Sequence, residues 1–278
     1  MRLAVLDNPA NLIAHGMTGR NYLSLSQVTT YQTCPLRWYF QYVAQLPHEQ
    51  VGASLVLGGA IHSAIEAYYQ AELAGEPVPD RDRLMTVFEE AWRKNANAPI
   101  HFGKDDSAGS LNDLAGRMVS AFLESSSCDP GGTVLGIEEE IRTEYLPGVP
   151  DLLARVDLII LTDDALVIRD FKTARSRWTA AKLAEAAVQL VLYGDLALPM
   201  AQAFGDRPVR LEFVVLTKTK SPQVEVLPVE ADAASLVRLR RIIERVWAAM
   251  QAGHVYPNPS ALNCSSCPFQ RACREWCD

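Results

Sequence analysis

The segment that most constrains the fold spans residues 156–174 and reads VDLIILTDDALVIRDFKTA. Two apolar runs rich in β-branched residues flank a Thr-Asp-Asp turn, which predicts a β-hairpin with largely buried strands. Buried strands normally exclude charge. The first strand nevertheless begins near Asp157, and the second ends with Asp170 and Lys172. These three charges therefore need either a bound partner or exposure to solvent.

The register of the hairpin decides between these alternatives. A turn centred between its two aspartates places Asp157 directly opposite Asp170, with Cβ atoms about 5 Å apart on the same face. Because side chains alternate along a strand, Lys172 projects to that face and Phe171 projects into the core on the other. Two facing carboxylates repel each other unless a cation lies between them. The register predicts a divalent-cation site with an ammonium beside it, and a solvated surface hairpin is the alternative.

Such a group of side chains suits phosphodiester hydrolysis. Carboxylate oxygens bind Mg²⁺ or Mn²⁺ and leave coordination positions for water and a substrate phosphate. The metal lowers the pKa of bound water and offsets charge on the phosphoryl group. A neighbouring lysine can stabilise the oxyanion of the transition state.

The remaining sequence predicts an α/β protein with helical additions. Two short helices are expected within 22–46, and the tail from 256 onwards is too rich in Pro, Ser and Cys for regular structure. Longer helices are expected at 55–73, 81–95, 111–126, 179–198 and 232–251, and strands at 133–145, 152–161, 165–172, 209–218 and 223–229.

Composition limits the class of protein. The chain has 278 residues, of which 49% are hydrophobic, and a net charge of −7. This charge argues against coating of nucleic acid by bulk electrostatics, although a local basic groove is compatible with it. We expect no membrane span and no signal peptide, and therefore a cytoplasmic location.

The hairpin charges resemble the signature of the PD-(D/E)xK nuclease superfamily, in its RecB-like branch. Asp157 in ARVDLI and the strand end Asp170-Phe171-Lys172-Thr173 carry this resemblance, with Ala154 where the family often has Gly. It implies a restriction-endonuclease-like core, a mixed β-sheet flanked by helices.

Three further stretches resemble family motifs. Gly59-Ala60-Ile61-His62 is similar to the G-x-x-H helix, whose histidine binds metal, although a packed or exposed histidine is the alternative from the residues alone. Gln189 and Tyr193 resemble the Q-x-x-x-Y motif, and their spacing places both on one helical face. Glu138 fits a less distinctive acidic position, for which Glu139 and Glu140 compete.

The resemblance implies two sets of site residues. The predicted catalytic residues are Asp157, Asp170, Lys172, Gln189 and Tyr193. The predicted metal-binding residues are His62, Asp157, Asp170 and Phe171.

The cysteines predict a second metal centre. Cys264-x-x-Cys267 and Cys273 offer three ligands, and Cys34 is the candidate for the fourth. Clustered cysteines in a chain without a secretion signal are typical of metal ligands. Spacing alone leaves zinc and iron–sulfur open, whereas the resemblance to RecB-like nucleases with iron–sulfur clusters implies [4Fe–4S]. Cys277 is an alternative ligand, and Cys128 is expected to be packed.

The loop after the hairpin predicts contacts with DNA. Arg175, Arg177 and Trp178 follow Lys172, and cations beside a tryptophan suit a single-stranded backbone with stacked bases. Lys182 follows on the next helix.

Together these observations predict a Mg²⁺- or Mn²⁺-dependent DNA nuclease. The resemblance implies an exonuclease on single-stranded ends with some endonuclease activity, in repair, recombination or phage DNA processing. One alternative is a nuclease of CRISPR spacer acquisition, which needs an integrase partner. A helicase is the other partner that the resemblance implies. Another is a catalytically silent iron–sulfur subunit that binds DNA. The expected domains are an extension at 1–21, a helical region at 22–128, the nuclease core at 129–230 and a cluster segment at 231–278.

Overall fold

The computed structural model describes residues 8–277, which form two compact units. One unit combines the chain up to Gln50 with 140–154 and the chain from Ala233 onwards, and the other combines 51–139 with 155–232. The four consecutive domains expected from the sequence stay a prediction. The two units are called the N/C unit and the central unit below.

The central unit holds the hairpin. Its helices are α4 (Ala53–Leu73), α5 (Arg81–Asn95), α6 (Ala108–Glu124) and α7 (Ala180–Ala203), with a 3₁₀ turn at Ser126–Cys128. Its strands are β2 (Val51–Gly52), β3 (Ile100–His101), β6 (Leu166–Ala174), β7 (Val209–Thr217) and β8 (Val224–Val229), together with the central-unit parts of β4 (Thr133–Thr143) and β5 (Leu152–Leu161).

The hairpin has the predicted register. Strands β5 and β6 are antiparallel, with Leu158 opposite Arg169 and Leu161 opposite Leu166. Continued by one residue, the same register sets Asp157 opposite Asp170. Strand β6 pairs in parallel with β7, which pairs antiparallel with β8, so the sheet is mixed.

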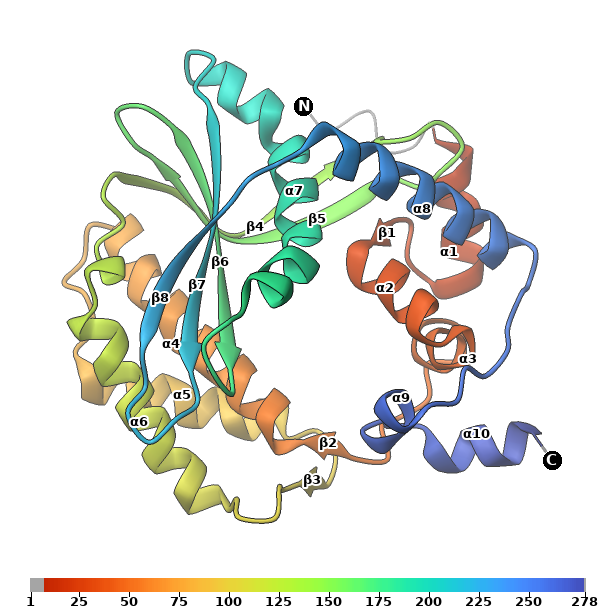
Figure 1. Ribbon diagram of the computed structural model, residues 1–278, viewed down its shortest axis with the longest axis horizontal. Helices are drawn as coiled ribbons and strands as arrows, with labels where there is room; N and C mark the ends of the chain where they lie inside the picture. Colours follow the sequence, from red (N-terminus) through yellow and green to blue (C-terminus); the bar gives the residue numbers. More distant parts are fainter. Residues whose placement is uncertain (1–7, 278) are drawn as a thin grey trace. The chain divides into compact units, whose positions relative to one another are not determined.

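The two faces of this sheet have different neighbours (Figure 1). Helices α4 and α6 contact one face, where Leu158, Ile160 and Phe171 lie in the hydrophobic core. Helix α7 contacts β6, β7 and β8. Because side chains alternate, Phe171 enters the core as predicted, and Asp170 and Lys172 project from the opposite face.

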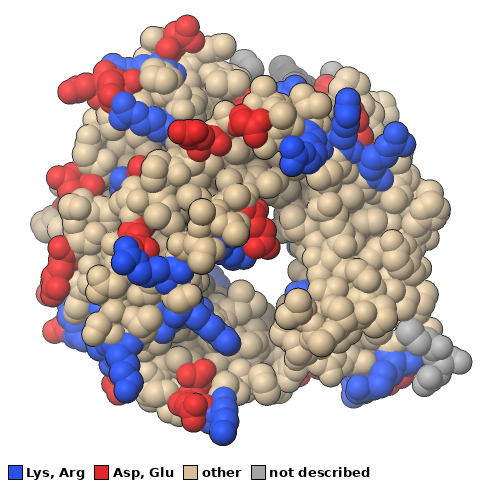
Figure 2. Space-filling model, in the orientation of Figure 1, with Lys and Arg blue, Asp and Glu red and all other residues tan. Residues whose placement is uncertain are grey.

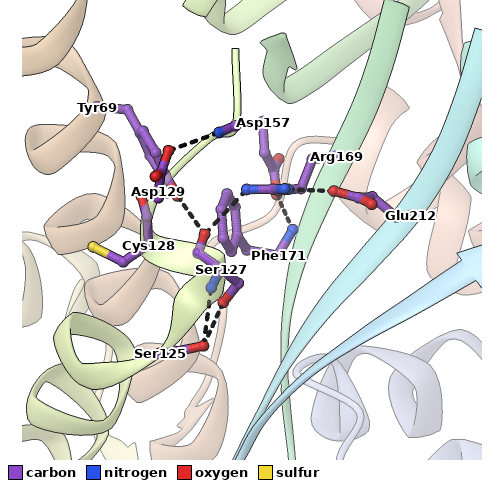
Figure 3. A network of polar contacts seen from close by, with 10 residues as sticks. Tyr69, Ser125, Ser127, Cys128, Asp129, Asp157, Arg169, Phe171 and Glu212 are labelled. Carbon is purple, nitrogen blue, oxygen red and sulfur yellow. Dashed lines mark hydrogen bonds and ion pairs between the residues drawn. The ribbon is translucent and has the colours of Figure 1, made fainter. Parts of the chain in front are cut away.

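A buried ion pair lies on the α4/α6 face, next to the site residues in sequence but on the other side of the sheet (Figure 3). Arg169 is 6% exposed and donates to Glu212 on β7 at 2.6 Å and to the Ser127 carbonyl at 3.1 Å. The Tyr69 hydroxyl donates to the Ser127 carbonyl at 3.0 Å. These contacts fasten the 3₁₀ turn and α4 to the back of β6.

The N/C unit is built around short helices. It contains α1 (Pro9–Thr18), β1 (Leu23–Ser24), α2 (Leu25–Thr33), α3 (Pro35–Trp38), a π-helical turn (Tyr39–Val43), α8 (Ala233–Gln251), α9 (Ala261–Ser265) and α10 (Gln270–Cys277). Ser24 caps α2 and Pro35 opens α3. Strand β1 pairs in parallel with the first residues of β5, Leu152 and Leu153.

One expectation about this unit was wrong. The tail contains α9 and α10, because Ser260 caps α9 and Glu49 accepts hydrogen bonds from the main-chain N–H groups of Arg271 and Ala272 in α10. The stretch before Asn21, expected as an extension, contains α1, and Asn8 and Asn11 bond to Asp151.

Helix α7 is long and apolar enough to cross a membrane by length and composition, which is weak evidence. Its buried residues, among them Leu190, Leu196 and Ala197, lie on the part of the helix that follows Gln189, and α7 contacts β6, β7 and β8. Packing in the core therefore accounts for part of its apolar character, since 39% of the apolar stretch is buried. The cytoplasmic location stays a prediction.

Candidate active site

Three potential metal ligands converge from three elements of the central unit. His62 on α4, Glu138 on β4 and Asp157 on β5 each offer a ligand atom, and these atoms lie within 4.8 Å of one another. His62 Nδ1 is 3.5 Å from Asp157 Oδ2. An imidazole and two carboxylates form a donor set suited to a divalent cation. Within residues 8–277 this is the one such group of His, Cys, Asp or Glu.

Local backbone features bring these side chains together. Glu138 has a positive φ of 49°, unusual for a residue other than glycine. In a strand such a conformation is a local irregularity that redirects a side chain, and Glu138 belongs to the ligand group whereas Glu139 and Glu140 are exposed. On α4, a Cβ atom at Gly58 would lie 3.1 Å from the Thr173 hydroxyl, so a glycine lets the helix pass close to the end of β6.

Asp170 belongs to a second set of contacts beside the three ligands. It is 1% exposed; its Oδ2 lies 2.6 Å from Lys172 Nζ, and its Oδ1 accepts from Gln189 Nε2 at 3.0 Å. The same Gln189 amide donates to the Tyr193 hydroxyl at 2.9 Å. Gln189 therefore reaches the hairpin through Asp170, and Tyr193 joins this set through Gln189.

Phe171 contributes its main chain, because its side chain is 3% exposed and packs in the core. Its N–H donates to Asp157 Oδ2 at 2.8 Å. This bond holds one carboxylate oxygen toward the hairpin.

The electrostatics of the group favour a bound cation. Burial and the neighbouring Asp170 raise the pKa of Asp157 to about 7, against the opposing effects of Lys172 and the Phe171 N–H. Burial, followed by Asp157 and Glu66, raises the pKa of Glu138. Burial and then Lys172 lower the pKa of His62, which keeps the imidazole neutral and able to bind metal. A divalent cation would offset the raised pKa values of the two carboxyl groups and would bind the imidazole in its neutral form.

Tyr193 keeps its proton, because burial raises its pKa to about 12. Its hydroxyl accepts from Gln189 and can still donate, so the pair can orient a water or a phosphate oxygen.

The four predicted cluster cysteines lie around one pocket of the N/C unit, without forming a group of three sulfurs within 4.8 Å of one another. Cys34, Cys264, Cys267 and Cys273 line one pocket, together with Phe40 and other apolar residues. Leu36, Phe40 and Phe269 form a small core against which Cys34, Cys267 and Cys273 pack. The Asn258 N–H lies 3.4 Å from the Cys34 sulfur.

The Cys267 thiol interacts electrostatically with its neighbours in the pocket. Burial raises the pKa of Cys267, the Phe269 main chain and Arg37 oppose this, and Cys34 and Cys264 raise it further. The Nε of Arg37, which also lines the pocket, is buried without a hydrogen-bond partner. Cys128 lies in the core of the central unit, as expected for a packed residue. The side chain of Cys277 lies outside the described residues.

The predicted DNA contacts line a pocket at the end of β6. Arg175, Arg177, Trp178 and Lys182 are all part of its wall, and Lys172 joins it from the site. Arg177 is already paired with Glu225, and the Trp178 ring packs edge-on against Phe213 at 5.1 Å. These two contacts hold the loop that the sequence assigned to DNA.

Sequence reasoning missed two residues of this pocket, Ser54 and Lys218. Neither belongs to a motif, and they lie 164 positions apart. It also left Glu138 undecided among three adjacent glutamates, where the positive φ is visible only in the structure.

Comparisons with known proteins show which family the chain resembles. A family model described as the PD-(D/E)XK nuclease superfamily matches residues 22–274. A solved structure of a "Putative exonuclease" from Eubacterium rectale aligns with a TM-score of 0.58 and 12% identity, over 99% of this chain and 93% of that one, which shows a shared fold. Another solved structure, SSO0001, has 14% identity over 88% of this chain and 94% of that chain, and its TM-score of 0.34 supports no inference. No curated protein sequence matches the chain.

Members of this superfamily typically use Mg²⁺ or Mn²⁺, and the ligand group on β4, β5 and α4 offers a site of that kind. The family match covers both the hairpin and the cysteines. The chain therefore belongs to the PD-(D/E)XK nuclease superfamily.

Proposed function

We propose that the chain is a divalent-metal-dependent deoxyribonuclease whose active site is the group around the hairpin. The observation that carries this proposal is the convergence of His62, Glu138 and Asp157 within 4.8 Å, on a hairpin whose Asp170 contacts Lys172. A silent DNA-binding subunit would not need this arrangement.

His62, Glu138 and Asp157 would hold Mg²⁺ or Mn²⁺, with Asp170 beside them as the further carboxylate predicted from the sequence. When bound, the metal supplies a more acidic water and a positive charge next to the scissile phosphate. The Lys172 ammonium places a second positive charge where negative charge develops on the phosphoryl oxygens. Gln189 restrains Asp170 and, with the Tyr193 hydroxyl, orients a water or phosphate oxygen.

Exonuclease action on single-stranded DNA ends is the finer part of the proposal. The name of the Eubacterium rectale structure supports the exonuclease assignment. The basic pocket beside Trp178 supports a flexible single strand, whose backbone contacts cations while its bases stack. The proposed settings are DNA repair, recombination or phage DNA processing.

The test is cleavage of DNA labelled at either end, single- and double-stranded, with Mg²⁺, with Mn²⁺ and with chelator. We expect metal-dependent release of short products from single strands, and loss of activity in Asp157→Asn and Asp170→Asn. Cleavage that persists in both variants would place the active site elsewhere. Binding without cleavage in any metal would favour the silent subunit.

We further propose that Cys34, Cys264, Cys267 and Cys273 hold a [4Fe–4S] cluster with a structural role. The shared pocket, the N–H directed at the Cys34 sulfur and the unpartnered Arg37 Nε support a group rich in thiolate and negative charge. Metal analysis of anaerobically purified protein distinguishes the cluster from a tetrathiolate zinc site. Stoichiometric zinc without iron would contradict the cluster.

A further inference from the structure

The pocket beyond Lys172 contains two cations that form no ion pair with a carboxylate of the described residues. Among the described residues, neither Arg175 nor Lys218 has an acidic oxygen within 4.0 Å of its charged group, whereas Arg177 pairs with Glu225 and Lys182 with Glu185. No Asp or Glu of residues 8–277 lines the pocket. Figure 2 shows Lys and Arg side chains gathered on the visible face over the ends of β6 and β7.

Lys218 is held in place by the fold. It follows the last residue of β7, and its N–H donates to the Ala174 carbonyl at the end of β6. Its Nζ lies 2.5 Å from the Ser54 hydroxyl. Because β6 and β7 are parallel, both carboxyl ends meet at this edge of the sheet, the edge where open α/β sheets bind ligands.

The pocket also contains the beginning of a helix without a capping side chain. Ser54 is the second residue of α4, and Gly52 at its N-cap provides no side-chain hydrogen bond to the first turn. A helix N-terminus carries partial positive charge and free N–H groups, which favour an anion. The pocket is therefore lined by two cations without an ion pair, a hydroxyl group and the beginning of a helix.

Lys218 is set up for an anionic partner that the protein itself does not provide. Burial, and then Arg175, lower its pKa, while Asp106 opposes them from beyond contact distance. A phosphate would reverse this balance. Lys172 lines the same pocket and contacts Asp170, so a phosphate bound there lies next to the one at the metal site.

We propose that Lys218, with Arg175 and the Ser54 hydroxyl, binds the internal phosphodiester of the substrate strand next to the scissile phosphate. This subsite rests on the proposed nuclease function, because the neighbouring phosphate defines it. It positions the strand and takes no part in bond cleavage.

The experiment compares Lys218→Met with Lys220→Met in the full chain. Both variants lose one positive charge near the β7–β8 turn, but Lys220 is exposed and lies outside the pocket. Single-stranded DNA binding is measured against salt with Ca²⁺, and cleavage with Mn²⁺. We expect Lys218→Met to weaken binding about tenfold and to reduce the salt slope of log K by about 0.7, with KM raised more than kcat is lowered. Lys218→Arg should restore most of the affinity, and Lys220→Met should change little.

Substrate variants identify the phosphate. A single neutral methylphosphonate next to the scissile position should weaken wild-type binding and remove the difference between wild type and Lys218→Met. Equal Lys218 effects on oligonucleotides with 5′-hydroxyl and 5′-phosphate ends support an internal phosphodiester, whereas an effect confined to 5′-phosphate ends overturns it in favour of a terminal phosphate.

The melting temperature separates binding from folding. A half-buried cation without a carboxylate does not stabilise the fold, so Lys218→Met should melt at the same or a higher temperature. If wild type cleaves DNA and Lys218→Met behaves like Lys220→Met, the subsite is wrong and the nuclease stands. If wild type neither cleaves nor binds, both proposals fail.

Discussion

At the scale of single residues, the hairpin carboxylates occupy positions that folding alone disfavours. Asp170 is 1% exposed, and Asp157 has its pKa raised to about 7 by burial and by Asp170. Charges in such positions cost stability unless a cation compensates them. The proposed cation site therefore accounts for buried carboxylates that folding by itself would disfavour.

Replacing Asp157 by Asn separates these effects. The change removes the repulsion, so the melting temperature without divalent ions should hold or rise while cleavage falls by at least about 10³-fold. Mn²⁺ stabilises wild type by mass action and should stabilise the variant much less. Differential scanning fluorimetry measures the melting temperature with and without Mn²⁺, and the cleavage assay measures the loss of activity. A variant that Mn²⁺ stabilises as strongly as wild type would show that Asp157 is not a ligand.

Lys172→Ala should behave differently, because lysine is not a metal ligand. Cleavage should fall by about 10²–10³-fold, the size of effect seen when one charge-stabilising donor is removed. The Mn²⁺-induced rise in melting temperature should remain. Loss of both would instead mean that Lys172 is needed to hold Asp170 and the metal site together.

The raised pKa of Asp157 predicts how pH acts on the metal-free protein. Its pKa is about 3.9 in an unfolded chain and about 7 in the folded one. The folded state thus binds this proton more tightly, so its contribution to stability is present below pH 4 and is lost as pH rises toward 7. Mn²⁺ must displace the proton, so its apparent affinity should rise by up to about tenfold per pH unit below 7 and level off above. Titration calorimetry at several pH values tests this, and Asp157→Asn should flatten this part of the profile.

At the scale of elements, strand β6 presents different chemistry on its two faces. Asp170 and Lys172 face the site, while Arg169 faces α4 and α6 and pairs with Glu212 (Figure 3). The ion pair of Arg169 on one face of β6 therefore helps to hold Asp170 and Lys172 in position on the other face.

Breaking the buried pair should therefore cost more than breaking an exposed one. Glu212→Gln leaves the Arg169 charge buried and should lower the free energy of unfolding by about 3 kcal/mol. The exposed pair of Arg210 and Asp164 offers a control, and Arg210→Met should lower the free energy of unfolding much less, because solvent screens this pair. Denaturant unfolding measures the free energy of unfolding of both variants. Equally small losses in the two would show that the Arg169–Glu212 pair does not anchor β6.

At the scale of the whole molecule, the N/C unit joins the beginning of the chain to its end. Cys34 lines one pocket with three cysteines of the tail, and Glu49 holds the first turn of α10. A cluster there would restrain a very long loop, much as a crosslink does.

Cys34→Ala should therefore lower iron content and stability together, with a stability loss of up to about 4 kcal/mol by analogy with a crosslink. Cys128→Ala, in the core of the central unit, should leave iron content unchanged. Iron analysis and thermal unfolding of anaerobic samples test this. Normal iron in Cys34→Ala would remove Cys34 from the ligand set and direct attention to Cys277.

The sequence by itself determined the register of the hairpin. Side chains alternate between the two faces of a strand, so a slip of one residue would move the apolar side chains out of the core. The position of the turn was therefore enough to set Asp157 opposite Asp170. Most helices and strands followed from periodicity for the same reason. The tail helices did not, since Ser260 caps one and Glu49 binds the other from far along the chain.

Only the tertiary structure decided which side chains gather around the hairpin. Glu138 joined the ligands rather than Glu139 or Glu140 because of one backbone conformation, and Ser54 met Lys218 because α4 begins beside the end of β7. Local pattern reports which face of an element a residue occupies. Which elements meet at that face depends on packing between segments distant in sequence, and no local pattern records it.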